Sequence, residues 1–185
     1  MKLKLPNTVP IFPLSGVIFF PKTNLPLNIF EPRYLALVND CEKTNKYMGL
    51  IQSKKSSSDV YSVGCLGKIT EKKKTGDGRI LLNLVGITRF EIKSEINSDK
   101  SYREFEVSYE KFHEDLNPKK EQVKKIEKIK ELSEKTKIFF KKNGLLLNWK
   151  EFEKLDEDQR INTLAMIAPI SNEEKQTILE SVNIR

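Results

Sequence analysis

The chain has 185 residues, of which 38% are hydrophobic and 32% are charged, and its formal net charge is +7. This length and apolar content are enough for a folded core in one domain, or in one domain with a smaller appendage. Two cysteines and one histidine are too few for a typical zinc site, which takes four such ligands, so we expect no bound metal. No segment approaches the ~18 unbroken apolar residues of a membrane span, and the N-terminus lacks a signal-peptide core. We therefore expect a cytoplasmic protein with no membrane contact.

The first part of the chain is predicted to form short strands around one helix. Apolar runs at 9–14, 17–20 and 25–30 are separated by turn residues and are typical of strands. The prolines among them cannot donate to a β-ladder, so we expect them at strand ends, edges or bends of a curved sheet. A helix is predicted from about Pro32 to Lys43, because proline is tolerated in a first turn and apolar residues recur at spacings of three and four. Cys41 then belongs to the packing face of this helix.

The β pattern is strongest between residues 60 and 110. The sequence Thr75-Gly76-Asp77-Gly78 has the composition of a hairpin turn that needs positive φ angles. Gly64 and Gly67 indicate a bulge or a close backbone approach, and Gly86 is predicted to interrupt a strand. Several short strands with frequent turns favour a barrel or a sandwich. The predicted strands of this region cover 61–69, 80–85, 89–93 and 104–108, and a further strand is predicted before it, at 47–52.

The pattern becomes helical after residue 115. A helix is predicted from an N-cap at Asn117 and a first-turn Pro118 to the neighbourhood of Gly144. Further helices are predicted over 156–168, with Asp156 and Gln159 as a capping pair, and after the capping-box sequence at 171–174. We therefore divide the chain into a β-rich subdomain, 1–115, and a helical subdomain, 116–185.

Residues for catalysis are not brought together by any motif of the sequence. His113 lies next to acidic residues in a predicted loop, with no nucleophile and no orienting partner at a recognisable spacing. The stretch from Gly64 to Thr70 lacks the glycine spacing of a phosphate-binding loop. Cys41 and Cys65 fall in apolar segments, where a thiolate is poorly solvated, so we interpret them as structural thiols. We expect no enzyme activity and no cofactor.

A resemblance to a known family is carried by segments that span nearly the whole chain. These segments are Pro10–Leu14, Val17–Pro21, Leu25–Phe30, Glu31–Tyr34, Val63–Gly67, Asp77–Arg79, Leu84–Phe90 and Ile170–Glu180. Together they resemble the N-terminal, substrate-binding domain of Lon proteases. The chain resembles a stand-alone copy of that domain, since no ATPase module with a phosphate loop and no proteolytic domain with a Ser-Lys dyad is found in it.

The resemblance implies a fold, a function and partners. The fold is α+β, a PUA-like β pseudo-barrel with one embedded helix, followed by a C-terminal helical bundle. The implied function is that of a non-catalytic protein-binding module, which recognises exposed apolar or unfolded segments as an adaptor. The implied partners are unfolded or tagged client proteins, a Lon-type protease and further copies of the chain.

A contact surface for clients is predicted at the turns of the apolar N-terminal stretch, because contiguous exposed apolar patches mark interaction sites. Its residues are Phe20 and Pro21 at one turn, and Phe30, Glu31, Arg33 and Tyr34 at the strand-to-helix junction. Arg33 is predicted to hydrogen-bond a client. The competing interpretation places Phe30 and Tyr34 in the core and pairs Glu31 with Arg33 locally.

A second functional hypothesis is RNA binding, which rests on the net charge of +7 and on the PUA-like relationship. Basic charge alone supplies only non-specific attraction for phosphate, and here basic and acidic side chains are interspersed along the chain. Nucleic acid is therefore not expected to be the main partner, and RNA binding is the alternative function.

Overall fold

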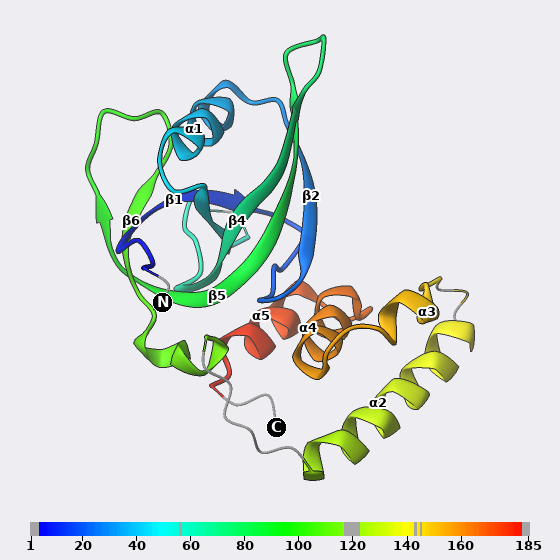
Figure 1. Cartoon of the computed structure of the whole chain (residues 1–185). Coiled ribbons are helices and arrows are strands. Elements are labelled where there is room, and N and C mark those ends of the chain that lie inside the picture. Colours follow the sequence, from blue (N-terminus) through cyan, green and yellow to red (C-terminus); the bar gives the residue numbers. More distant parts are fainter. Residues whose placement is uncertain (1–3, 56, 117–122, 143, 145, 183–185) are drawn as a thin grey trace.

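The computed structural model describes residues 4–55, 57–116, 123–142, 144 and 146–182. Its strands form one mixed sheet with the order β2-β5-β4-β3-β1-β6, and an additional β5–β6 pairing closes the sheet into a barrel (Figure 1). The pseudo-barrel expected from the sequence is thus confirmed. The strands are β1 (Thr8–Leu14), β2 (Asn24–Ile29), β3 (Tyr47–Gln52), β4 (Val63–Lys74), β5 (Ile80–Ile96) and β6 (Glu104–Ser108).

The longest strand, β5, connects the two halves of the sheet. Its first half pairs with β2 and β4, and its second half pairs with β4 and β6. The predicted interruption at Gly86 is wrong, because the strand continues through this residue. A Cβ atom at Gly86 would lie 2.3 Å from the carbonyl oxygen of Phe20, so the glycine lets a neighbouring segment pack directly on the strand.

That neighbouring segment is the apolar run 17–20, which is not the strand that the sequence predicted. Its backbone has no regular secondary structure, yet Ile18, Phe19 and Phe20 are buried. A short apolar run has the same composition whether it forms a ladder or fills a core as a loop. Here the run packs on the barrel as an irregular segment. It is followed by a turn in which Lys22 has a positive φ of 59°.

Pro26 of the N-terminal stretch lies on an open edge of the sheet. Strand β2 pairs only with β5 among the described strands, and the Gly86 N–H donates to the carbonyl of Thr23. Because backbone groups alternate between the two edges of a strand, those of Pro26 point away from β5. The missing N–H of Pro26 therefore costs no ladder bond, as expected for a proline at the edge of a sheet.

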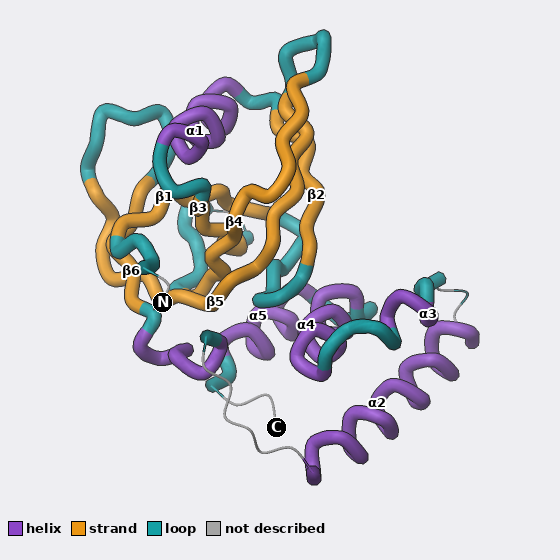
Figure 2. The backbone as a smooth tube through the Cα atoms, in the orientation of Figure 1, coloured by secondary structure: helices purple, strands orange, loops and turns teal. Residues whose placement is uncertain are grey.

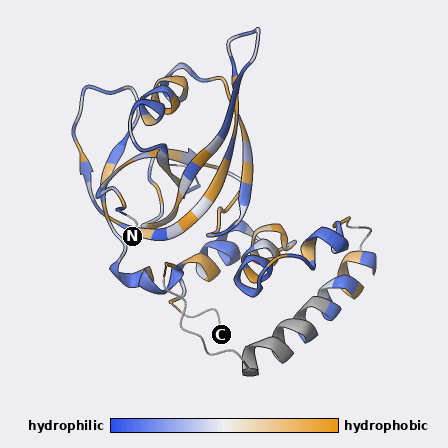
Figure 3. Ribbon diagram, in the orientation of Figure 1, coloured by the Kyte–Doolittle hydropathy of each residue, from blue (hydrophilic) through white to orange (hydrophobic). Residues whose placement is uncertain are grey.

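Helix α1 (Pro32–Lys43) begins and ends where the sequence predicted it, with proline in its first turn. Its buried side chains include Leu37, Val38 and Cys41, which pack with residues of β2, β3, β4 and β5 in the largest apolar cluster. A second cluster joins β1, β3, β4, β5 and β6. Hydrophobic and hydrophilic positions alternate along the strands in Figure 3, as expected for a sheet with one inner face.

The tip of the β4–β5 hairpin has the predicted turn. The Thr75 N–H donates to the Arg79 carbonyl at 2.9 Å, and Gly78 has a φ of +87°. A register shift between Leu66 and Gly67 supplies the predicted bulge in β4. The hairpin extends well beyond the barrel in Figure 1.

The helical region follows a 3-10 helix, η1 (Glu110–Asp115), that the sequence did not predict. Capping boxes Asp156–Gln159 and Ser171–Glu174 open two of the helices as predicted, whereas Asn117 and Pro118 lie outside the described residues. The helices are α2 (Val123–Lys142), α3 (Trp149–Phe152), α4 (Glu157–Ile167) and α5 (Asn172–Glu180). In Figure 2 α4 and α5 lie beneath the barrel, while α2 lies away from it.

The helical region is attached to the barrel through a third apolar cluster and through hydrogen bonds from the buried Arg89 side chain to the carbonyls of Leu179 and Ser181. Leu179 of α5 packs with Ile18, Phe20 and Phe112.

No helix within the described part of the chain is both long and apolar enough to cross a membrane. The division of the chain at residue 115 stays a prediction.

Candidate functional site: an open groove over β1

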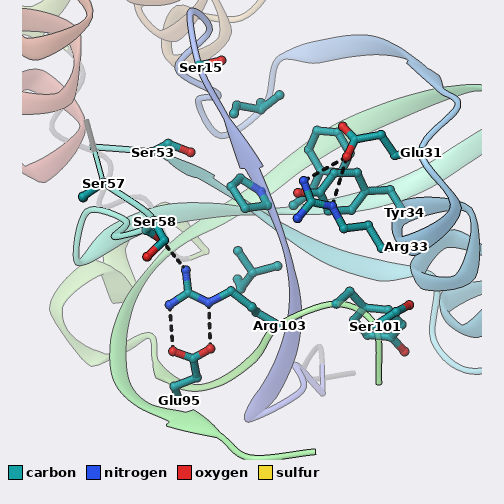
Figure 4. Close-up of a pocket in the computed structure, with 15 residues that line it drawn as sticks. Ser15, Glu31, Arg33, Tyr34, Ser53, Ser57, Ser58, Glu95, Ser101 and Arg103 are labelled. Carbon is teal, nitrogen blue, oxygen red and sulfur yellow. Dashed lines mark hydrogen bonds and ion pairs between the residues drawn. The ribbon is translucent and has the colours of Figure 1, made fainter. Parts of the chain in front are cut away.

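An open groove with a volume of about 790 Å³ lies over the second half of β1 (Figure 4). Its floor is formed by residues 11–15, and its walls come from the start of α1, from Ser53, Ser57 and Ser58, and from the end of β5 with the connection to β6. The lining combines hydroxyl groups, aromatic rings and two Arg–Glu ion pairs. Its residues are Ile11, Phe12, Pro13, Leu14, Ser15, Glu31, Arg33, Tyr34, Ser53, Ser57, Ser58, Glu95, Ser101, Tyr102 and Arg103.

The first ion pair lies at the start of α1. The Nε of Arg33 donates to a Glu31 carboxylate oxygen at 3.0 Å, and the Arg33 guanidinium lies 4.6 Å from the centroid of the Tyr34 ring. That ring packs in turn on Phe12, with ring centroids 4.4 Å apart. Burial raises the pKa of Tyr34 above its ordinary value, so its hydroxyl is neutral at physiological pH. The stack holds Arg33 in place while leaving much of its side chain exposed.

The second ion pair lies across the groove, where β5 ends and β6 begins. Arg103 donates through Nε and Nη2 to the two carboxylate oxygens of Glu95, both at 2.7 Å, and through Nη1 to the Ser58 carbonyl at 2.8 Å. The hydrogen bonds from Arg103 lower the pKa of Glu95, which therefore stays ionised at neutral pH. This bidentate geometry fixes both side chains, and the third hydrogen bond ties Ser58 to the sheet.

The residues predicted to contact clients separate into two groups. Glu31, Arg33 and Tyr34 line the groove, and Phe30, which directly precedes Glu31, has 63% of its surface exposed. The competing interpretation is right in two respects, because Tyr34 is buried and Glu31 pairs with Arg33.

Phe20 and Pro21 lie elsewhere, inside the molecule. Phe20 is 1% exposed and packs in the cluster that attaches α5, and the Pro21 carbonyl accepts a hydrogen bond from the Asn162 side chain at 2.9 Å. These two residues hold the helical region on the barrel. In this arrangement they do not reach the groove.

Glu95, Arg103 and the serines of the groove were missed by sequence reasoning. The sequence contains a signal for the pair, since a polar turn joins two predicted strands that carry opposite charges near their facing ends. Register decides whether such charges meet, and the pairing of β5 with β6 includes a shift between Ile92 and Ser94 that the composition does not reveal.

The residues considered for catalysis in the sequence do not line the groove. His113 lies on η1, exposed, with its Nδ1 3.1 Å from the Glu110 carbonyl oxygen. Burial raises the pKa of Cys41 to about 12 and also raises the pKa of Cys65, so both thiols stay protonated. Within the ranges that the structure describes, no group of three or more His, Cys, Asp or Glu side chains could hold a metal ion.

Comparison with known proteins identifies the family. The model of the ATP-dependent protease La (LON) substrate-binding domain matches residues 8–185. The chain belongs to this family. In Lon proteases the domain binds substrates rather than performing catalysis, and no catalytic domain is detected in this chain.

Curated relatives of the chain are full-length Lon proteases. The Lon protease of Desulfosudis oleivorans is 35% identical over 103 residues, which cover 52% of this chain and 13% of that protein. The Lon protease of Endomicrobium trichonymphae is 24% identical over 193 residues, which cover 97% of this chain and 23% of that protein. The chain thus spans at most about a quarter of the length of these relatives.

Solved structures of Lon N-terminal domains share the fold. A Lon N-terminal domain protein from Xanthomonas campestris superimposes with a TM-score of 0.65 at 22% identity. The N-terminal domain of a Mycobacterium avium complex Lon protease superimposes with a TM-score of 0.70 at 16% identity. Each match covers 95% of this chain and 91% of the other. The α+β fold expected from the sequence is confirmed.

Proposed function

We propose that the chain is a non-catalytic module that binds exposed apolar or unfolded segments of client proteins and acts as an adaptor. The observation that carries the proposal is the groove over β1, one wall of which is built from the family's Glu31–Tyr34 motif. Phe30 offers an exposed aromatic ring immediately before this wall, and large exposed apolar side chains favour contact with a partner.

The proposal is tested with a polypeptide in folded and unfolded forms. We expect fluorescein-labelled α-lactalbumin to bind the chain after reduction and carboxymethylation, and to bind much less in its native, disulfide-bonded form. Fluorescence anisotropy measures both affinities. Equal binding of the two forms, or binding of neither, would contradict the proposed function.

Phe30 provides the mutational test of the surface. Phe30→Ser removes an exposed aromatic contact, and we expect it to weaken binding of the unfolded probe about fivefold or more, as for a typical hot-spot residue. Leu146→Ser is the matched control, because Leu146 is 98% exposed and lies outside the groove. An unchanged affinity of Phe30→Ser, with circular dichroism showing a folded protein, would remove this residue from the contact surface.

A Lon-type protease and further copies of the chain are the proposed assembly partners. The likeness to the substrate-binding domain of Lon proteases supports the first of them. We expect the chain to raise the rate at which a Lon protease from the same cell degrades a bound client, measured as release of acid-soluble fragments. Sedimentation velocity at several concentrations tests the self-association.

RNA binding is the second candidate function, and one surface feature favours it. The protruding β4–β5 hairpin exposes Lys72, Lys73, Lys74 and Arg79 near its tip. Contacts of this kind neutralise phosphates, so the affinity must fall steeply with salt. Titration with single-stranded RNA at about 50 mM and about 200 mM salt tests this candidate, and the absence of binding at the lower concentration would exclude it.

A further inference from the structure

The groove lies over an open edge of the sheet. Strand β1 pairs with β6 along Thr8–Pro10 and with β3 along Ile11–Leu14. The last contact with the β6 side is the hydrogen bond from the Ile11 N–H to the Arg103 carbonyl at 2.9 Å. Beyond this bond, the segment that precedes β6 turns away from β1. Beyond Ile11, the edge of β1 that faces away from β3 has no strand partner within the described ranges.

The backbone groups on this open edge can be assigned from two hydrogen bonds. The Ser53 N–H donates to the Leu14 carbonyl at 2.9 Å, so the backbone groups of Leu14 face the β3 side, whereas those of Ile11 face the β6 side. Because successive residues alternate between the edges, the Pro13 carbonyl points to the open edge together with that of Ile11. Pro13 has no N–H, so at this position the edge can accept a hydrogen bond but cannot donate one.

We propose that the groove binds an uncharged, extended polypeptide segment as an additional strand along β1, next to residues 11–15. The inference rests on the proposed function and specifies how the client is held. Main-chain hydrogen bonds then supply affinity without requiring a particular client sequence, as in other cases of strand addition. The groove follows the strand over these five residues.

The charges of the groove favour a client segment without charged side chains. Arg33 and Arg103 each have a carboxylate partner, Glu31 and Glu95 respectively, so the two pairs contribute no net charge. A charged client side chain would lose water here without gaining a free counter-ion. This pairing disfavours phosphate groups as well.

Serine hydroxyls replace the hydrogen-bond donor that Pro13 lacks. Those of Ser15, Ser53 and Ser101 line the groove and have no hydrogen-bond partner among the described residues. A hydroxyl both donates and accepts, so these groups can serve client carbonyls that find no N–H on β1. Such a ladder is incomplete, which makes the binding reversible, and the proline also prevents permanent edge-to-edge pairing between copies of the chain.

The decisive variant restores the missing donor. We expect Pro13→Ala to bind the reduced, carboxymethylated α-lactalbumin probe about two- to tenfold more tightly, because it adds one N–H to the open edge. Pro26→Ala is the matched control, since Pro26 also lies on an open edge but outside the groove, and its affinity should equal that of the unmodified chain. Equal or weaker binding by Pro13→Ala would overturn strand addition.

An obstructing variant tests the same inference without touching β1. Ser101 is exposed, so Ser101→Trp should fold while filling part of the groove, and we expect it to lower the affinity at least fivefold. Ser98→Trp places the same side chain on the same loop at an exposed position outside the groove, and should have no effect.

The outcomes distinguish this inference from the proposed function. If the unmodified chain binds the unfolded probe but a folded Pro13→Ala variant does not bind it more tightly, strand addition in the groove is wrong and client binding stands. If the unmodified chain binds no unfolded probe, the proposed function fails and the inference fails with it. If Pro13→Ala does not fold, Ser101→Trp decides alone.

Discussion

Arg89 connects three separate parts of the chain through one side chain. Its guanidinium donates to both carboxylate oxygens of Asp115, at 3.0 and 2.7 Å, and to the backbone carbonyls of Leu179 and Ser181, at 3.0 and 2.6 Å. Its planar group also lies 4.3 Å from the ring centroid of Phe112. Arginine suits this position because its fixed fork of donors matches several acceptors at once.

Substitution of Arg89 should therefore destabilise the protein strongly. Arg89→Met leaves the Asp115 carboxylate without its guanidinium partner and with only the hydrogen bond from the backbone N–H of residue 89, so we expect a loss of about 3–5 kcal/mol in the free energy of unfolding. Urea denaturation followed by circular dichroism measures it. The matched control is Arg79→Met, because Arg79 pairs with Asp77 at the exposed hairpin tip and such pairs contribute only about 0–1 kcal/mol.

The reactivity of the two cysteine thiols reports whether these side chains are buried. Burial raises the pKa of Cys41 to about 12, and its thiol donates to the Tyr47 carbonyl at 3.2 Å. The thiolate is the reactive form, so a disulfide reagent at pH 8 should not react with Cys41 or Cys65 in the folded chain. Both should react rapidly in urea, where the pKa returns to its ordinary range. Rapid release of two equivalents of chromophore without denaturant would contradict the buried positions.

The stability of strand β5 depends on close packing of the 17–20 segment against Gly86. At Gly86 there is no room for a Cβ atom, because the Phe20 carbonyl occupies its place. We expect Gly86→Ala to lower the free energy of unfolding by about 1–3 kcal/mol, as for other overpacked sites. Gly76→Ala is the control, since a Cβ atom there would meet nothing within 4 Å and the φ angle is not positive. Thermal unfolding of the two variants gives the comparison, and similar stabilities would show that β5 and the 17–20 segment separate easily.

Local patterns were sufficient to predict elements that are stabilised locally. The hairpin at 75–78, helix α1 and the capping boxes have their causes within a few neighbouring residues, and all were found from the sequence. The run 17–20 was misassigned because its conformation depends on β5, which lies more than sixty residues away.

The same distinction holds for the candidate site. Arg33 and Glu31 were named from a contiguous motif, whereas Arg103 and Glu95 meet only through the β5–β6 register. Burial of Phe20 likewise depends on Leu179, from the other end of the chain. The residue pattern alone does not reveal which distant segments contact each other.

At the scale of the whole molecule, the barrel and the terminal helices share one core. Leu179 covers Ile18 and Phe20, and the carbonyls at the end of α5 complete the hydrogen bonds of Arg89. We expect a fragment of residues 1–115 to be less stable than the whole chain and to bind a fluorescent hydrophobic dye, because it exposes this cluster. Dye fluorescence and urea denaturation of the two proteins test this. Equal stability and no dye binding would show that the division at residue 115 separates independent folding units.

The pairing of β1 with β6 also constrains the order in which the chain can fold. Residues 8–10 find their partners at 104–106, so β1 must wait for nearly the whole β-rich part to be synthesised. Its parallel pairing with β3 likewise bridges a long segment, and contacts so distant in sequence slow folding. Until then β1 exposes both edges, and Pro10 and Pro13 remove two of its donors during the interval when the nascent chain is most prone to aggregate.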